Sequence, residues 1–333
     1  MTSDSPLVSV IVVNWNGERL LKPCLQSLVD QTYHAREIIL VDNGSEDDSV
    51  ETVSRLFPQV TIVPLPRNTG FAGGSIAGLG ASKGDLIALL NNDTRVEPQF
   101  LERLVAAALQ DHRIGICAPK LFYEGKADSL NGAGHGLTTA GVGFDRGVGA
   151  RPSRYTKPES VFGACAAASL YRRSMLDDIG FFDEEFFIYD EDADLNARAQ
   201  LAAWKCRFVP DAMVHHVGGA SSGKLSDNHV YFHSRNLEFV WLKNMPATLM
   251  LRYAHHKLIQ EFGAFLYLCL RHGRWRPYFR AKRDALRMLP SMIKKRRAVQ
   301  ALKRVSDGDF RRTLTPVFQY DWLAQKTRQL LRG

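Results

Sequence analysis

Cysteine is scarce in this sequence of 333 residues, which holds five cysteines and no CxxC pair. Because their number is odd and they lie far apart, a disulfide framework and a cysteine-based zinc site are both disfavoured. Such usage is typical of a reducing compartment, and we expect the protein to work in the cytoplasm. Internal repeats and low-complexity segments are also missing, which argues against repeat architectures and extended disorder.

Long apolar runs are missing as well. The N-terminus has no basic residue before its first apolar run, residues 7–15, so this run predicts a buried strand rather than a secretory signal. Near the C-terminus the uncharged run from Phe262 to Leu270 is only nine residues long, whereas a membrane-spanning helix needs about 20 residues. We therefore expect no transmembrane segment.

The net charge of +8 is distributed unevenly along the chain. Residues 1–245 hold 23 Lys and Arg against 30 Asp and Glu, a balance of −7. Residues 246–304 hold 15 against 2, a balance of +13, and residues 305–333 hold 5 against 3. We therefore predict an acidic main domain over residues 1–245 and a helical basic extension over residues 246–333.

The basic extension could bind nucleic acid or an anionic membrane surface. Residues 255–283 mix an apolar stretch with Trp275, Tyr278 and flanking Arg and Lys, which is typical of a helix lying in the membrane interface. No base-reading motif accompanies the charge, and the acidic domain would repel nucleic acid. We therefore predict peripheral attachment to the inner face of the cell membrane and no nucleic-acid partner. An ordinary helical subdomain with a solvated basic face is the alternative.

Strand and helix patterns alternate through the acidic part of the chain. Continuous β-branched runs predict strands buried on both faces, and the segments between them predict helices. Short loops between these elements indicate parallel βαβ units, so we predict an α/β fold with a Rossmann-like, mostly parallel sheet flanked by helices. The Gly-rich residues 123–160 predict loops or hairpins. The expected strands are 7–15, 37–45, 60–65, 85–93 and 206–216, and the expected helices are 17–31, 46–57, 70–84, 97–111, 192–204 and 229–244.

Polar side chains close three of the expected strands. Ligands bind at the carboxyl ends of strands in such sheets, so we expect these side chains to line one crevice. Asp42 can accept hydrogen bonds from a nucleotide, although an N-cap for the next helix is the alternative. Asp93 can hold a divalent cation, or it can form a capped turn. The polar residues at these strand ends are Asn14, Asn16, Asp42, Asn91, Asn92 and Asp93.

Two further segments carry groups that suit a phosphorylated ligand. Residues 67–74, RNTGFAGG, place glycines at a helix start, where exposed N–H groups suit an anion. Tight helix packing is the alternative for Gly73 and Gly74. His215 and His216 end another expected strand and can bind a metal or donate to a phosphate, although a lone histidine is more often structural.

The stretch FFDEEFFIYDEDADL, residues 181–195, contains seven carboxylates interleaved with aromatic residues. A solvated charge run would not alternate with Phe in this way, so part of this acid is expected to be buried. Glu191 and Asp192 begin an expected helix and can face the crevice, where a carboxylate can take a proton from a sugar hydroxyl. Asp194 and Arg198 have the i, i+4 spacing of a salt bridge, which is the simpler interpretation of Asp194.

The order of these motifs resembles the inverting nucleotide-sugar glycosyltransferases of family two, and most of all their rhamnosyltransferase branch. The resemblance rests on VSVIVVNWNG, LVDNGSEDDS, RNTGFAGG, LLNND, FGACAAASLYRRSML, FFDEEFFIYDEDADLNAR and VHHVGGAS, and it covers roughly residues 7–245. It implies a GT-A-type fold for this catalytic domain, a nucleotide-diphosphate sugar donor, and a divalent cation, Mg²⁺ or Mn²⁺.

The resemblance also implies roles for individual residues. Asp192 matches the base that deprotonates the acceptor, with Glu191 beside it. Asp93 matches the last acid of a DxD metal motif whose first position is here Asn91, and His216 matches a histidine near the metal, with His215 as the alternative register. The implied nucleotide-binding residues are Asn14, Asn16, Asp42, Asn68, Gly70, Asn91 and Asn92, and the implied acceptor-binding residues are Gly163, Ala164, Arg172 and Asp194.

We therefore expect inverting transfer of a sugar, with L-rhamnose from dTDP-rhamnose as the first candidate, to a glycan or lipid-linked acceptor in cell-surface polysaccharide biosynthesis. Another donor, such as a UDP-hexose, UDP-galactofuranose or a GDP-sugar, is the alternative. A sugar-nucleotide pyrophosphorylase would want a Gly-rich loop with a basic residue after the first strand, which NWNGERLLKP lacks. A non-catalytic, membrane-bound binding module is disfavoured because Asp42, Asp93 and Asp192 are intact. The sequence does not indicate an oligomeric state.

Overall fold

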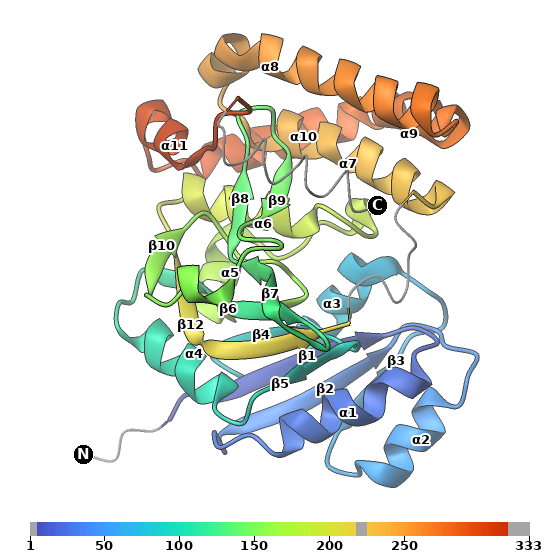
Figure 1. The fold of residues 1–333 in the computed structure, drawn as a ribbon, viewed down its shortest axis with the longest axis vertical. Coiled ribbons are helices and arrows are strands. Elements are labelled where there is room, and N and C mark those ends of the chain that lie inside the picture. The colour runs from blue at the N-terminus through green and yellow to red at the C-terminus, as the bar shows by residue number, and fades with distance from the viewer. Residues whose placement is uncertain (1–4, 218–224, 319–333) are drawn as a thin grey trace.

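Figure 1 shows the computed structural model of the chain, which describes residues 5–217 and 225–318. A central sheet with its flanking helices occupies the lower part of the view, and the helices that follow residue 226 lie above it. Within the described residues, no helix is both long and apolar enough to cross a membrane.

The sheet is mostly parallel, as the alternating pattern predicts. Four strands, in the order β3-β2-β1-β4, run parallel, and β11 then lies antiparallel between β4 and β6. Strand β12 pairs parallel with β6 and carries the short strands β10 and β5. The strands are β1 Val8–Asn14, β2 Arg36–Asp42, β3 Thr61–Pro64, β4 Leu86–Asn91, β5 Thr94–Val96, β6 Ile114–Tyr123, β7 Lys126–Ala133, β10 Glu159–Val161, β11 Ala168–Arg172 and β12 Lys205–His216.

Helices cover the sheet because its strands are apolar on both faces. Val10 and Ile11 point to opposite sides, and both are fully buried. Helix α3 approaches β1 closely, since a Cβ on Gly78 would lie 2.4 Å from Ile11 Cγ2. The helices of this part are α1 Glu18–Val29, α2 Ser49–Leu56, α3 Gly70–Ala81, α4 Phe100–Leu109, α5 Arg173–Ile179 and α6 Glu191–Leu201, with 3-10 turns η1 Pro152–Arg154 and η2 Glu184–Phe186.

The Gly-rich region contains two hairpin pairings. Strand β7 pairs with β6, and β8 His135–Leu137 pairs with β9 Gly143–Asp145. The β8–β9 hairpin rises from the sheet toward the C-terminal helices (Figure 1). Part of the Gly-rich region therefore connects the central sheet with these helices.

The C-terminal helices share a hydrophobic core with the rest of the molecule. Phe310 is 1% exposed and packs edge-on against Phe162, with ring centroids 6.5 Å apart. Met292 and Val299 belong to the same buried cluster as Ala193 and Leu201 of α6. The predicted division at residue 245 therefore marks a change of charge and not a break in packing. These helices are α7 Asp227–Asn244, α8 Ala247–Phe265, the π-helical η3 Leu266–Arg271, α9 Trp275–Arg287, α10 Leu289–Ala301 and α11 Asp307–Thr313.

This shared core makes a stability prediction. We expect Phe310→Ala to lower the free energy of unfolding by about 3–5 kcal/mol, because it removes a buried ring and leaves a cavity. Phe262→Ala is the control, since Phe262 is 64% exposed, and it should change stability by less than about 0.5 kcal/mol. Urea denaturation of the full chain measures both values, and equal effects of the two substitutions would contradict the shared core.

Candidate active site

Amide side chains from β1 and from the turn after β4 meet at the carboxyl edge of the sheet. Asn92 Nδ2 donates to Asn14 Oδ1 over 2.7 Å, and Asn14 Nδ2 donates to Ser45 Oγ over 3.3 Å. Asn16 has a left-handed backbone, with φ of 50°, and its Oδ1 accepts from the Glu46 N–H over 2.8 Å. Hydrogen bonds thus tie three strand ends together at this edge of the sheet.

Asp42 has a buried carboxylate oxygen at this edge of the sheet. The side chain lies at the end of β2, and the residue is 5% exposed. Its Oδ2 accepts only a long bond, 3.4 Å, from the Ser45 N–H, and among the described residues its Oδ1 has no hydrogen-bond partner. The N-cap of the next helix is Asp48, so the capping alternative does not apply. An unpartnered buried oxygen suits a ring N–H or hydroxyl of a ligand.

Asn68 and Gly70 shape the turn beside Asp42. Asn68 Oδ1 accepts from the Gly70 N–H over 2.8 Å, and Asn43 Nδ2 donates to the Gly70 carbonyl over 2.9 Å. Gly70 has φ of 76°, and a Cβ there would lie 2.2 Å from the Phe187 carbonyl oxygen. Only glycine fits this position. The geometry therefore shows Asn68 and Gly70 holding the turn, and a direct contact with the nucleotide remains a prediction.

Asp93 and His216 face each other across the crevice floor. Asp93 Oδ1 lies 3.2 Å from His216 Nε2, and His216 Nδ1 lies 3.0 Å from Asn131 Oδ1. Nε2 of His216 therefore faces the Asp93 carboxylate, while Nδ1 faces the Asn131 amide. His215 points elsewhere, with its Nε2 2.9 Å from Glu97 Oε1.

These two side chains fit a divalent cation as a partial set of ligands. The carboxylate oxygen of Asp93 and the imidazole nitrogen of His216 are 3.2 Å apart, so both can bind the same cation. Among the described residues, however, no group of three or more His, Cys, Asp or Glu comes together as a metal cage. The remaining ligands would have to come from the diphosphate of a bound donor and from water.

Asp192 is anchored at the start of α6. Its Oδ2 accepts from the Ala166 N–H over 3.0 Å, and its Oδ1 accepts from the Ala193 N–H over 2.7 Å. These two backbone donors fix the carboxylate in one orientation. The side chain is half-buried, so it keeps an open side toward the crevice.

Glu191 has the opposite environment. It is 5% exposed, and its Oε2 has no hydrogen-bond partner among the described residues. Burial and the neighbouring charge of Asp192 raise the pKa of Glu191 well above its ordinary value. The two adjacent carboxyl groups therefore lie in unlike environments, Asp192 on two backbone donors and Glu191 in a buried position that raises its pKa.

Asp145 joins the two halves of the site and was missed in the sequence. Burial raises the pKa of this carboxyl, the charge of His135 lowers it, and Asp192 raises it; His216 contributes as well. The charges of Asp192 and His216 both shift the pKa of Asp145, so Asp145 lies near the candidate base and near the candidate metal pair. It lies in β9, within the Gly-rich region that predicts only loops or hairpins, so no sequence signal marked it.

Two predicted acceptor residues lie away from the crevice. Asp194 is fully buried and is bonded to Arg198, Lys243 and Asn244. Arg172 ends β11, which runs antiparallel, and pairs with Leu86 at the amino end of β4. Its guanidinium donates to the carbonyls of Ile114 and Ala108. These are structural contacts, and an acceptor-binding role for Asp194 and Arg172 stays a prediction.

Gly163 and Ala164 close against the helix that carries the base. Asn196 Nδ2 donates to the Ala164 carbonyl over 2.9 Å, and a Cβ on Gly163 would lie 2.1 Å from Asn196 Cγ. Gly163 therefore permits close approach of this segment to α6. The same segment continues to Ala166, whose N–H donates to Asp192. The segment therefore helps to fix the position of Asp192, the candidate base.

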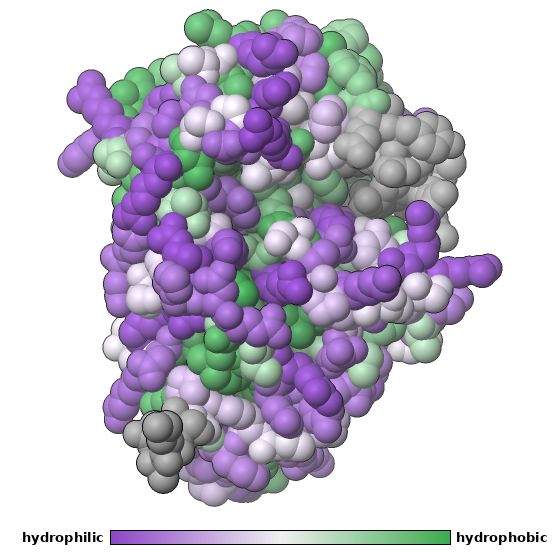
Figure 2. Space-filling model, turned by 90° about the vertical axis from the view of Figure 1, so that its left-hand side faces the viewer, coloured by the Kyte–Doolittle hydropathy of each residue, from purple (hydrophilic) through white to green (hydrophobic). Residues whose placement is uncertain are grey.

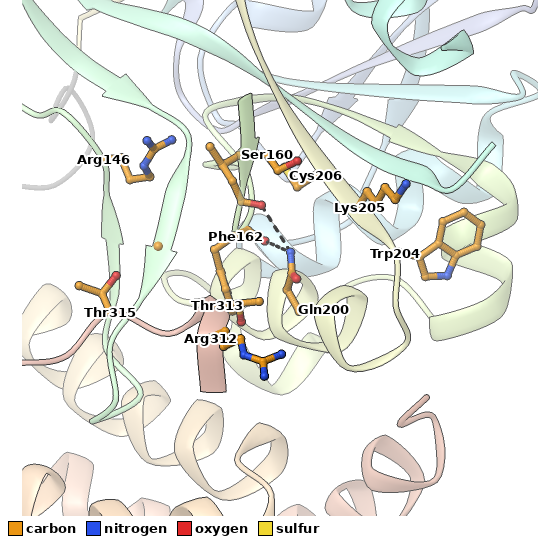
Figure 3. Close-up of a pocket in the computed structure, with 12 residues that line it drawn as sticks. Arg146, Ser160, Phe162, Gln200, Trp204, Lys205, Cys206, Arg312, Thr313 and Thr315 are labelled. Carbon is orange, nitrogen blue, oxygen red and sulfur yellow. Dashed lines mark hydrogen bonds between the residues drawn. The ribbon is translucent and has the colours of Figure 1, made fainter. Parts of the chain in front are cut away.

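A cavity of about 400 Å³ lies at a different place, beside the β10 edge of the sheet (Figure 3). It contains none of the predicted site residues. Two of its cations already have partners, since Arg146 is 3.0 Å from Glu159 and Lys205 is 2.6 Å from Asp111. This cavity therefore does not coincide with the predicted donor site. Its lining is Gly136, Arg146, Ser160, Val161, Phe162, Gln200, Trp204, Lys205, Cys206, Arg312, Thr313 and Thr315.

Comparison with known proteins identifies the class of this fold and site. Residues 9–180, more than half of the chain, match the family model described as glycosyl transferase family 2. The chain therefore belongs to glycosyl transferase family 2. This result confirms the predicted family, the α/β fold and the transferase class.

Several relatives are similar to this chain over most of its length. An N-acetylglucosaminyl-diphospho-decaprenol L-rhamnosyltransferase of Mycobacterium tuberculosis is 27% identical over 254 residues, which cover 69% of this chain and 82% of that protein. An N-acetylglucosaminyltransferase of Rhizobium meliloti is 27% identical over 229 residues, 64% of this chain and 51% of that protein. The mycobacterial match supports the predicted rhamnosyltransferase-like branch.

Solved structures show the same fold at low sequence identity. GalNAc-T7 with UDP, GalNAc and Mn²⁺ has a TM-score of 0.57 and 19% identity, covering 71% of this chain and 48% of that one. The mannosyltransferase PcManGT of Pyrobaculum calidifontis, with GDP-Man and Mn²⁺, has a TM-score of 0.52 and 13% identity, covering 90% and 86%. This chain therefore spans about half the length of GalNAc-T7. Both neighbours were solved with Mn²⁺.

The environment of Glu191 makes a pH prediction. A raised pKa means that the folded protein holds this proton more tightly than the unfolded one, so stability falls as pH rises above the ordinary value of 4.5 toward the folded pKa. Glu191→Gln has no carboxyl group to ionise at this position and avoids the loss of stability. The Tm of this variant minus the Tm of the unaltered protein should therefore increase as pH rises from 4.5. The exposed Glu184 supplies the control, Glu184→Gln. Thermal unfolding at several pH values tests this, and a pH-independent difference would contradict it.

Proposed function

We propose that this enzyme transfers a sugar from a nucleotide-diphosphate donor to a hydroxyl of its acceptor in one inverting displacement, with Asp192 as the base. The observation that carries this proposal is the anchoring of Asp192 by two backbone N–H groups at the start of α6, beside the buried Glu191. The polar edge that holds Asp42, Asp93 and His216 supports a donor site next to it.

The chemistry follows from these groups. Asp192 takes the proton of the acceptor hydroxyl as its oxygen attacks the anomeric carbon. The bond from that carbon to the diphosphate oxygen breaks on the opposite face, so the configuration inverts. A cation held by Asp93 and His216 would neutralise charge on the departing diphosphate. One carboxylate base suffices because the diphosphate is already a good leaving group, unlike the alkoxide in glycoside hydrolysis.

We infer further that the sugar is L-rhamnose, donated by dTDP-rhamnose, and that the acceptor is a glycan or a lipid-linked glycan of cell-surface polysaccharide biosynthesis. The similarity to the mycobacterial rhamnosyltransferase, at 27% identity, supports this finer assignment. A UDP- or GDP-linked sugar is the alternative, because the two solved neighbours carry UDP and GDP-Man.

The base assignment predicts the effect of one substitution. We expect Asp192→Asn to keep the fold and donor binding and to lower the transfer rate by about 10²–10⁴-fold, because a general base is lost. Asp177→Asn, at an exposed position, should leave the rate unchanged. Initial rates with a panel of nucleotide sugars measure this. An active Asp192→Asn beside an inactive Glu191→Gln would assign the base to Glu191 instead.

We also propose that helices α8 and α9 attach the enzyme to the inner face of the cell membrane. One side of α8 exposes Leu251, Leu258 and Phe262, which are 82%, 70% and 64% exposed, and α9 exposes Trp275 and Phe279, both 53%. Figure 2 shows hydrophobic residues among hydrophilic ones along the top of the molecule, where α8 lies. Such an amphipathic surface suits the headgroup region of a bilayer.

The charges of this surface suit anionic lipid. Some basic residues of α8–α10 form ion pairs within the protein. Lys257 and Lys282, for example, are both paired with Glu238 and Glu261. Within the described residues, Arg252, Arg271 and Arg276 form no ion pair, and each is the sequence neighbour of an exposed apolar residue. Each such cation adds roughly 1 kcal/mol of attraction near an anionic surface.

This surface predicts selective binding to liposomes. We expect the protein to sediment with anionic liposomes at low salt and much less with neutral ones. A double substitution, Leu258→Glu with Phe262→Glu, should abolish sedimentation, whereas Leu109→Glu, at a 59% exposed position on α4, should not. Equal sedimentation with both liposome types, or none with either, would remove the electrostatic part of the proposal.

A further inference from the structure

The loop that leads into the base has a constrained backbone. Phe187, Tyr189 and Asp190 have φ of 65°, 71° and 65°, a left-handed conformation that residues other than glycine rarely adopt. Asp190 is also the N-cap of α6, only two residues before Asp192. Such a backbone persists only where its surroundings hold it, so the position of the base depends on what contacts this loop.

Helix α7 holds the loop by its backbone. The two N–H groups of Asn236 Nδ2 are shared among the carbonyls of Phe186, Ile188 and Tyr189, at 2.9, 2.9 and 2.7 Å. Asn236 is fully buried. On the opposite side the Phe187 carbonyl accepts from the Ala72 N–H of α3 over 3.0 Å, so the loop is also in contact with the turn beside Asp42.

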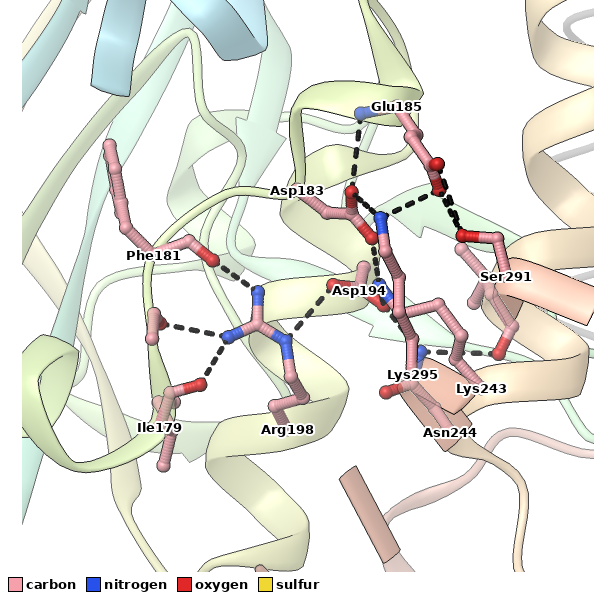
Figure 4. Close-up of polar contacts among 12 residues, drawn as sticks. Ile179, Phe181, Asp183, Glu185, Asp194, Arg198, Lys243, Asn244, Ser291 and Lys295 are labelled. Carbon is pink, nitrogen blue, oxygen red and sulfur yellow. Dashed lines mark hydrogen bonds and ion pairs between the residues drawn. The ribbon is translucent and has the colours of Figure 1, made fainter. Parts of the chain in front are cut away.

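Two lysines hold the same loop by its carboxylates (Figure 4). Lys243 of α7 lies 2.7 Å from Asp183 and 3.0 Å from Asp194, which are on either side of the base. Lys295 of α10 lies 2.5 Å from Asp183 and 2.6 Å from Glu185. Each ammonium therefore bridges two acids, and Lys295 does so from more than 100 residues along the chain.

The surroundings make these pairs effective. Asp183 is 11% exposed and Lys295 32%, so the contact is partly screened from water. Burial raises the pKa of Asp183, but the charge of Lys243 and bonds from both lysines lower it overall. Burial lowers the pKa of Lys295, and its bonds to Asp183 and Glu185 raise it above the ordinary value. Both partners are therefore charged at neutral pH.

We propose that Lys295 is a positioning residue, through which the C-terminal helices fix the loop that presents Asp192 to the acceptor. This inference rests on the proposed role of Asp192. Lys295 itself does not touch Asp192; it acts through Asp183 and Glu185. Its loss should leave the shared apolar core intact and loosen the loop. The consequence is a base that is present but less often in its productive position.

The test compares Lys295→Met with Lys294→Met in the full-length protein. Lys294 is its neighbour on α10, is exposed, and forms no ion pair within the described residues. We expect Lys295→Met to lower kcat about tenfold, because small displacements of catalytic groups are costly, with the KM for the donor within about twofold. Lys294→Met should change neither, and Lys295→Arg should restore most of kcat because it restores the charge.

Hydrogen exchange of the backbone amides gives a readout that needs no turnover. Lys295→Met should speed exchange in residues 183–192 and leave the strands β1, β2 and β4 unchanged. This result would stand even if Asp192 proved not to be the base, so the two proposals fail separately. Unchanged exchange in the loop, or a kcat equal to that of Lys294→Met, would overturn the positioning role. Faster exchange throughout the sheet would also overturn it, since that indicates general destabilisation.

Discussion

The buried charge of Asp194 constrains the arrangement of the whole upper half of the molecule. This carboxylate is fully buried, and an unpaired charge there would cost several kcal/mol. Arg198 Nε at 3.0 Å, Lys243 Nζ at 3.0 Å and Asn244 Nδ2 at 2.9 Å compensate it. Burial alone would raise the pKa of Asp194, but its cationic partners lower it to about 2. Helices α6 and α7 must therefore pack together for this charge to be satisfied.

The position of the proposed base, Asp192, depends on that packing. Arg198 extends the network by donating to the carbonyls of Ile179, Gly180 and Phe181, at the entry to the acidic stretch. Lys243 joins Asp194 to Asp183, so both ends of the loop before Asp192 are fixed to α7. The donor half of the site is built differently, because Asn14, Asp42 and Asn92 stand at the ends of strands that the sheet ladder already aligns.

Much of the sheet and its polar edge could be predicted from the sequence because buried parallel strands carry an unmistakable apolar pattern, and their ends define the crevice. The ends of antiparallel strands are different. Arg172 lies at the opposite edge because β11 reverses direction, and sequence spacing does not reveal direction. Asp145 was hidden in a glycine-rich hairpin. The charge boundary at residue 245 describes the surface of the molecule, whereas Met292 and Phe310 belong to a buried core that residues on both sides of the boundary share.

The central claim is a single displacement with one carboxylate base. It is tested most directly by the anomeric configuration of the product, determined by NMR on the first glycoside formed with whichever nucleotide sugar supports turnover. The account predicts that the configuration at the anomeric carbon is the opposite of that in the donor, because Asp192 directs attack from the face away from the diphosphate. Retention of configuration would contradict it, since retention requires a second displacement or attack from the same face.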